Sequence, residues 1–123
     1  MKAVILAAGL PVLGVCRGMQ VLVDACGGTL RRVPGHVAVE HAIRSEDGSY
    51  DTVNSYHSFA APDLPEPLAA TARAADGVVE AVRHRSLPFR GIMWHPERYA
   101  APRAADIALF RRIFGIPDPG EQP

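Results

Sequence analysis

One cysteine of this chain stands in a setting that suits a nucleophile. Cys16 lies in the segment Gly-Val-Cys-Arg-Gly, which follows a short apolar run and precedes a stretch with helical periodicity. A strand, a Gly-x-Cys-x-Gly turn and a helix together are typical of a nucleophile elbow. A thiol at a helix N-terminus is favoured as the thiolate, so we expect a lowered pKa for Cys16. The backbone N–H of Arg17 would then face the oxyanion of a tetrahedral intermediate.

A base and an orienting acid for that nucleophile follow later in the chain. His95 ends the apolar stretch 89–94, and one proline separates it from Glu97. A cysteine nucleophile needs such a base, and the base needs a carboxylate to orient it. Because α/β active sites assemble at one edge of the sheet, we expect His95 to come close to Cys16. Each motif alone also fits a structural role, as a buried cysteine or a surface turn, but their combination favours acyl-transfer chemistry.

The composition fits one domain without a strongly charged partner. Thirteen basic and thirteen acidic side chains cancel, so no electrostatic field attracts nucleic acid or an anionic membrane. The longest apolar run, residues 3–15, is interrupted by glycine and proline and is too short to span a bilayer. Because the start of the chain also lacks a signal-peptide pattern, we expect a cytoplasmic protein.

The remaining thiol and imidazole groups lack the spacing of metal ligands. Cys16 and Cys26 match neither a metal motif nor a dithiol motif, and a reducing compartment argues against a disulfide between them without excluding it. Four further histidines form no ligand pair on a helix and join no carboxylate cluster, so we predict no metal site. These histidines are His36, His41, His57 and His84.

The elements expected around these residues alternate between strands and helices. A helix is expected from Arg17, with an apolar face at i, i+3, i+4 and i+7 that ends at two glycines. An Asp-Gly turn predicts a hairpin of residues 68–74 and 78–83. Further strands are expected at residues 2–6, 11–15, 37–41, 51–54 and 89–94. A last helix is expected at residues 102–114 with Ile107, Phe110, Ile113 and Phe114 facing inward.

Three motifs, in this order, resemble those of the class I glutamine amidotransferases. They are PVLGVCRGMQVL, VNSYHSFA and GIMWHPERY, and the resemblance covers residues 11–114. The sequence is most similar to a stand-alone branch, peptidase C26-like hydrolases of γ-glutamyl amides such as γ-glutamyl-CDP-amidate and γ-glutamyl-γ-aminobutyrate. The resemblance implies a flavodoxin-like, three-layer α/β fold. It also implies hydrolysis of a γ-glutamyl amide through a cysteine thioester, releasing glutamate and an amine without a cofactor.

The same resemblance implies roles for particular residues. Cys16, His95 and Glu97 would form the catalytic triad. Gln20 would help to hold the glutamyl group of the substrate. The residues whose backbone groups would grip the α-amino and α-carboxylate ends of that group are Tyr56, Ser58 and Phe59.

The first ten residues, MKAVILAAGL, resemble the opening strand of sugar-phosphate nucleotidyltransferases, which leads into a phosphate-binding loop. Only residues 7–10 separate this strand from the next, whereas neighbouring parallel strands need a crossover of about 10–12 residues. The family resemblance implies earlier strands and helices that supply a second oxyanion donor. We therefore interpret residues 11–116 as an N-terminally shortened amidotransferase-like domain, followed by a disordered tail at 117–123.

Two alternatives to a stand-alone hydrolase remain open. A subunit of an amidotransferase would pass ammonia to a synthetase partner, whereas an inactive fragment would serve only as a binding domain. Missing strands would leave a sheet edge exposed, which favours dimerisation or an unstable monomer. The partners expected are therefore a second copy of the chain or, for an amidotransferase subunit, a synthetase.

Overall fold

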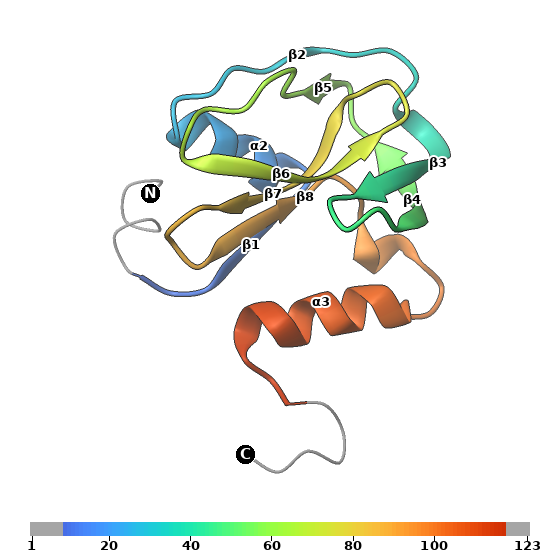
Figure 1. The fold of residues 1–123 in the computed structure, drawn as a ribbon. Helices are drawn as coiled ribbons and strands as arrows, with labels where there is room; N and C mark the ends of the chain where they lie inside the picture. Colours follow the sequence, from blue (N-terminus) through green and yellow to red (C-terminus); the bar gives the residue numbers. More distant parts are fainter. Residues whose placement is uncertain (1–8, 118–123) are drawn as a thin grey trace.

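A mixed sheet forms the centre of the fold (Figure 1). The computed structural model describes residues 9–117. Its strands are β1 (Val12–Val15), β2 (Arg31–Arg32), β3 (Val37–Ser45), β4 (Tyr50–Tyr56), β5 (Phe59–Ala60), β6 (Leu68–Ala74), β7 (Val79–His84) and β8 (Phe89–Ile92). Within this part of the chain the main sheet has the order β1-β8-β7-β6-β3-β4, and β2 pairs with β5 separately. The β1–β8 pair is parallel, and the other neighbours in the main sheet are antiparallel.

Two α-helices cover opposite faces of the main sheet (Figure 1). Helix α2 (Arg17–Ala25) packs on one face of the sheet, against one buried apolar cluster. Helix α3 (Ala104–Phe114) lies across the other face, where Leu109 contacts another buried apolar cluster. A short 3₁₀ helix, η1 (Pro96–Arg98), lies between β8 and α3. The expected three-layer α/β arrangement is therefore confirmed. No helix within residues 9–117 is long and apolar enough to cross a membrane.

The parallel pair brings the segments that carry Cys16 and His95 to one edge of the sheet. Val12 lies opposite Phe89, and Val15 lies opposite Ile92, so β1 and β8 end side by side. Cys16 directly follows β1, and the segment that carries His95 follows β8. The expected common edge is thus present, although the two strands are far apart in the sequence.

Helix α2 follows from the apolar spacing after the cysteine. Met19, Leu22 and Val23 are buried against the sheet, as the helical pattern predicts. The helix ends just before the two glycines, as expected. Gly27 has a φ of 92°, which glycine adopts without strain and which stops the helix.

The close approach of α2 to the sheet depends on two strand glycines. A Cβ atom at Gly14 would lie 2.6 Å from the carbonyl carbon of Gly18. One at Gly91 would lie 2.6 Å from Cγ of Met19. Side chains at these two strand positions would push the helix away, whereas a Cβ at Gly18 would meet nothing within 4 Å.

The hairpin predicted from an Asp-Gly pair is confirmed. Gly77, with a φ of 85°, lies in the turn between β6 and β7, directly after Asp76. Gly48, with a φ of 87°, has the same role between β3 and β4. Strand β8 ends at Ile92, two residues before the predicted end. The strand predicted at residues 2–6 lies outside the described residues.

Helix α3 differs from the prediction in its start and in its buried face. It begins at Ala104 and not at residue 102. Three residues expected to face inward, Ile107, Phe110 and Phe114, are 39%, 38% and 46% exposed.

A polar anchor explains this orientation of α3. Asp106 is only 3% exposed and accepts a hydrogen bond from the indole Nε1–H of Trp94 over 2.9 Å. Its other carboxylate oxygen accepts a bond from Nε of Arg103 over 3.1 Å. These charged contacts turn Asp106 and Leu109 toward the sheet, so the apolar stripe that the sequence favoured faces outward.

Candidate active site

The turn between β1 and α2 holds Cys16 in a strained backbone conformation. Its φ is 52° and its ψ is −99°, which is unusual for a residue with a side chain. Such outliers cost on the order of 1–3 kcal/mol and persist where the surrounding structure enforces them. The Cys16 amide donates to the Ile92 carbonyl over 2.7 Å, and the Cys16 carbonyl accepts from the Gln20 amide over 3.1 Å. The expected strand–turn–helix geometry of a nucleophile elbow is therefore present.

The protonation of Cys16 differs from the expectation. Burial raises the pKa of the Cys16 thiol above its ordinary value, since the side chain is only 9% exposed. A hydrogen bond from the backbone N–H of Arg17 and the positive charge of Arg98 oppose this effect without reversing it. The N-terminus of α2 thus does not lower the pKa as predicted, because desolvation is the larger effect. Cys16 and Cys26 are both free thiols, so no disulfide joins them.

His95 and Glu97 form a directly bonded pair beyond β8. Nδ1 of His95 lies 2.7 Å from Oε2 of Glu97. Burial alone would raise the pKa of Glu97, but hydrogen bonds from its own backbone N–H and from His95 lower it below the ordinary value. The carboxylate therefore fixes the proton on Nδ1 and leaves Nε2 of His95 able to act as a base.

Asn54, which the sequence did not single out, positions His95. Its Oδ1 accepts from the His95 backbone N–H over 2.8 Å, and its Nδ2 donates to the His95 carbonyl over 2.9 Å. The Asn54 backbone N–H donates in turn to the hydroxyl of Tyr99 over 2.8 Å. Asn54 is 6% exposed. It belongs to the VNSYHSFA motif, which also contains expected site residues, and this shared motif is the sequence signal that could have indicated its role.

Three of the residues expected to bind substrate, Gln20, Tyr56 and Phe59, make contacts within the candidate site. Nε2 of Gln20 donates to the carbonyl of Phe59 over 3.0 Å. The ring of Tyr56 lies edge-on to that of His95, with centroids 5.9 Å apart, and Arg98 stacks over Tyr56 at 4.2 Å. The start of β5 thus contacts α2, and the end of β4 contacts the segment that carries His95.

The carbonyl groups of this loop are already bonded within the chain. The Ser58 carbonyl accepts from the Val33 amide over 2.9 Å. The Phe59 carbonyl accepts from Gln20 and also lies 3.0 Å from Nδ1 of His57. The Phe59 carbonyl thus already has two partners, whereas the Ser58 carbonyl keeps one lone pair for a further hydrogen bond.

Comparison with known families identifies the chain. The family model for "Glutamine amidotransferase class-I" matches residues 1–114. The chain belongs to this family. The predicted class of amidotransferase is therefore confirmed, and with it the fold. The class I amidotransferase chain also resembles the solved structure of a putative GMP synthase component from Thermoplasma acidophilum, with a TM-score of 0.80 at 21% identity. That match covers 94% of this chain and 61% of the other.

Relatives of the chain include a synthase and a synthase component. It is 43% identical over 104 residues to an anthranilate synthase of Azospirillum brasilense, a match that covers 75% of this chain and 14% of that protein. It is 36% identical over 102 residues to anthranilate synthase component 2 of Thermococcus kodakarensis, covering 76% of this chain and 53% of the relative. A relation to the stand-alone γ-glutamyl hydrolase branch, as first expected, finds no support in these names. The matched part thus spans about half the length of the Thermococcus kodakarensis protein.

Proposed function

We propose that this chain is the glutamine-hydrolysing part of an amidotransferase that supplies ammonia to a synthase. The observation that carries the proposal is the elbow at Cys16, which the parallel β1–β8 pair brings to the same sheet edge as the bonded pair of His95 and Glu97. A nucleophile, a base and an orienting carboxylate are the groups that amide hydrolysis through a covalent intermediate needs. The relatives named as synthases favour ammonia supply over release of the amine to solvent.

The proposed reaction begins at the sulfur of Cys16. Nε2 of His95 takes the thiol proton, and the sulfur attacks the γ-carbonyl carbon of glutamine. The backbone N–H of Arg17 donates to the oxyanion that forms. His95 returns the proton to the departing nitrogen, so ammonia leaves and a γ-glutamyl thioester remains on Cys16.

Hydrolysis of the thioester completes the proposed cycle. His95 takes a proton from water as the water oxygen attacks the thioester carbonyl, and it then returns that proton to the sulfur. Glutamate leaves with the new oxygen, and the thiol of Cys16 is restored. Glu97 stabilises the imidazolium form of His95 in both halves, and the overall reaction is glutamine plus water to glutamate plus ammonia.

The raised pKa of Cys16 fits this sequence of steps. A thiol that is protonated in the free protein needs a base at the moment of attack, and His95 supplies that base.

The experiment that tests the proposal measures glutamate release from L-glutamine by the chain alone and with the synthase chain of the same organism. The expected result is slow release alone and a rate at least tenfold higher with the synthase. Cys16→Ala is expected to abolish release, and Cys26→Ala serves as the matched control that keeps it.

A stand-alone hydrolase would behave differently in the same experiment. It would release glutamate from γ-glutamyl amides with larger amine groups at full rate, and the synthase would change nothing. That result would overturn the role in ammonia supply while leaving the roles of Cys16 and His95 intact. Release that persists in Cys16→Ala would overturn the chemistry itself.

A further inference from the structure

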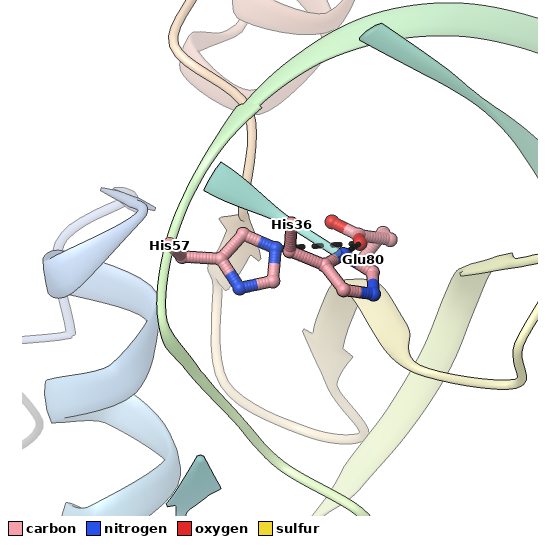
Figure 2. A group of neighbouring side chains, drawn as sticks. All are labelled: His36, His57 and Glu80. Atoms are coloured by element: carbon pink, nitrogen blue, oxygen red, sulfur yellow. Dashed lines mark ion pairs between the residues drawn. The ribbon is translucent and has the colours of Figure 1, made fainter. Parts of the chain in front are cut away.

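A cluster of buried histidines surrounds Glu80, whose charge also helps to raise the pKa of Cys16. Nδ1 of His36 lies 3.2 Å from Oε1 of Glu80, and Nε2 of His41 and Nε2 of His57 each lie 3.4 Å from that oxygen. His36, His57 and Glu80 are 2%, 2% and 1% exposed. Figure 2 shows the rings of His36 and His57 beside the carboxylate of Glu80. The sheet thus gathers residues whose spacing along the chain predicted no metal site.

In two of these rings the outer nitrogen, the one that does not contact Glu80, already has a hydrogen-bond partner. Nδ1 of His57 lies 3.0 Å from the Phe59 carbonyl, which can only accept a hydrogen bond, so this nitrogen carries a proton. Nε2 of His36 lies 2.6 Å from Oδ2 of Asp76. A carboxylate only accepts hydrogen bonds, so this nitrogen of His36 is the donor.

Because the outer nitrogens carry the protons, the inner nitrogens, which contact Glu80, are left with lone pairs. In neutral rings, Nδ1 of His36 and Nε2 of His57 are acceptors, and both face Oε1 of Glu80, which is also an acceptor. In the described part of the chain these three atoms and Nε2 of His41 are buried without a hydrogen-bond partner. Acceptors that face one another without a proton or a cation between them are costly in a low-dielectric interior.

The distances between the histidine nitrogens and Oε1 of Glu80 fit a shared metal ion better than direct hydrogen bonds. Charge-assisted N–H···O bonds are about 2.7–2.9 Å long, shorter than any of the three contacts to Glu80. Ligands that bind zinc tetrahedrally at about 2.0–2.1 Å lie about 3.3 Å from one another. The contacts of 3.2 and 3.4 Å match that spacing, and the donor atoms of His36, His57 and Glu80 all lie within 4.8 Å of one another.

We propose that His36, His57 and Glu80 bind a zinc ion in a buried structural site, with His41 lying beside Glu80. Imidazole and carboxylate groups are ordinary zinc ligands, and the outer bonds of His36 and His57 are those that orient metal-bound histidines. The site ties the entry to β3, the loop after β4 and strand β7 together. Because His57 and Gln20 share the Phe59 carbonyl, the ion also steadies the loop beside the triad.

The test measures zinc binding by the whole protein after removal of metal with a chelator. One equivalent of added Zn²⁺ is expected to stay bound through gel filtration and to raise the thermal midpoint. Co²⁺ in its place is expected to give the visible absorption of a tetrahedral site. Both readouts are independent of catalysis, so they stand or fall separately from the proposed glutaminase activity.

Variants separate this site from binding to thiols or to surface histidines. Glu80→Gln keeps the side-chain volume and adds an amide donor for the histidine lone pairs, so the protein should fold while zinc affinity falls more than about 100-fold. Asp76→Asn, which changes an outer partner, should weaken zinc about 10–100-fold. His84→Gln is the matched control, because His84 lies outside the cluster and should change nothing.

Two outcomes would overturn the proposed zinc site. No bound zinc in the folded wild-type protein would exclude the site. Equal affinity in the wild type and in Glu80→Gln would show that zinc binds elsewhere, for example at Cys16. Should Glu80→Gln fail to fold, His36→Gln provides the same comparison at another proposed ligand.

Discussion

Cys16 combines a strained backbone with a thiol that burial keeps protonated. Its φ of 52° is enforced by the amide contact to Ile92, and its raised pKa comes from its low exposure. The strand–turn–helix pattern and the shared sheet edge of Cys16 and His95 could be anticipated from the sequence, because they depend on local spacing and on a family resemblance. The sign of the pKa shift could not, since desolvation depends on the side chains that fold over the sulfur.

Alkylation of Cys16 is expected to rise with pH only above the ordinary pKa of a thiol. A raised pKa means that the protonated, unreactive form persists to higher pH, and the thiolate appears later. The measurement is the rate of iodoacetamide modification of Cys16 between neutral and alkaline pH, followed by peptide mass spectrometry. A midpoint below the ordinary thiol value would contradict the effect of burial.

Asn54→Ala is expected to lower kcat about 10²-fold with little change in KM, because a misplaced base slows the chemistry more than binding. Asn54 bonds to both the backbone N–H and the carbonyl of His95, whose carbonyl also accepts from the Arg98 amide. Steady-state glutaminase kinetics check this, with a circular-dichroism spectrum to confirm folding. An unchanged kcat in a folded variant would show that His95 is positioned by other contacts.

The elements around the site were predicted with unequal success. Helix α2 and the β6–β7 hairpin follow from short-range patterns, namely apolar spacing and an Asp-Gly turn. The pairing of β1 with β8 depends on contacts distant in the sequence. The orientation of α3 depends on a bond between Asp106 and Trp94 that no apolar pattern records.

The strand–helix contact at the elbow predicts opposite effects of two similar substitutions. Gly14→Ala would place a Cβ 2.6 Å from the Gly18 backbone and should destabilise the protein by about 1–3 kcal/mol. Gly18→Ala, where a Cβ meets nothing within 4 Å, should leave stability unchanged or slightly higher. Urea unfolding of both variants measures the difference, and equal destabilisation would show that α2 does not pack closely on β1.

The three-layer fold contains both the candidate active site and the histidine cluster around Glu80. The elbow and the His95 pair lie at the end of the parallel strands, and the histidine cluster around Glu80 lies in the antiparallel half. The Phe59 carbonyl connects them through its bonds to Gln20 and His57. The cluster could not be anticipated from the sequence, because its members come together only when strands β3 and β7 and the loop after β4 fold into one sheet.

For the molecule to hydrolyse glutamine as proposed, Cys16 must be the residue that carries the γ-glutamyl group. The most direct measurement is mass spectrometry of the protein after reaction with a chloroketone analogue of glutamine. We predict a single adduct on Cys16, prevented by excess L-glutamine and absent in Cys16→Ala, with Cys26 unmodified. An adduct on Cys26, or one on Cys16 that glutamine does not prevent, would contradict a glutamine site at this elbow.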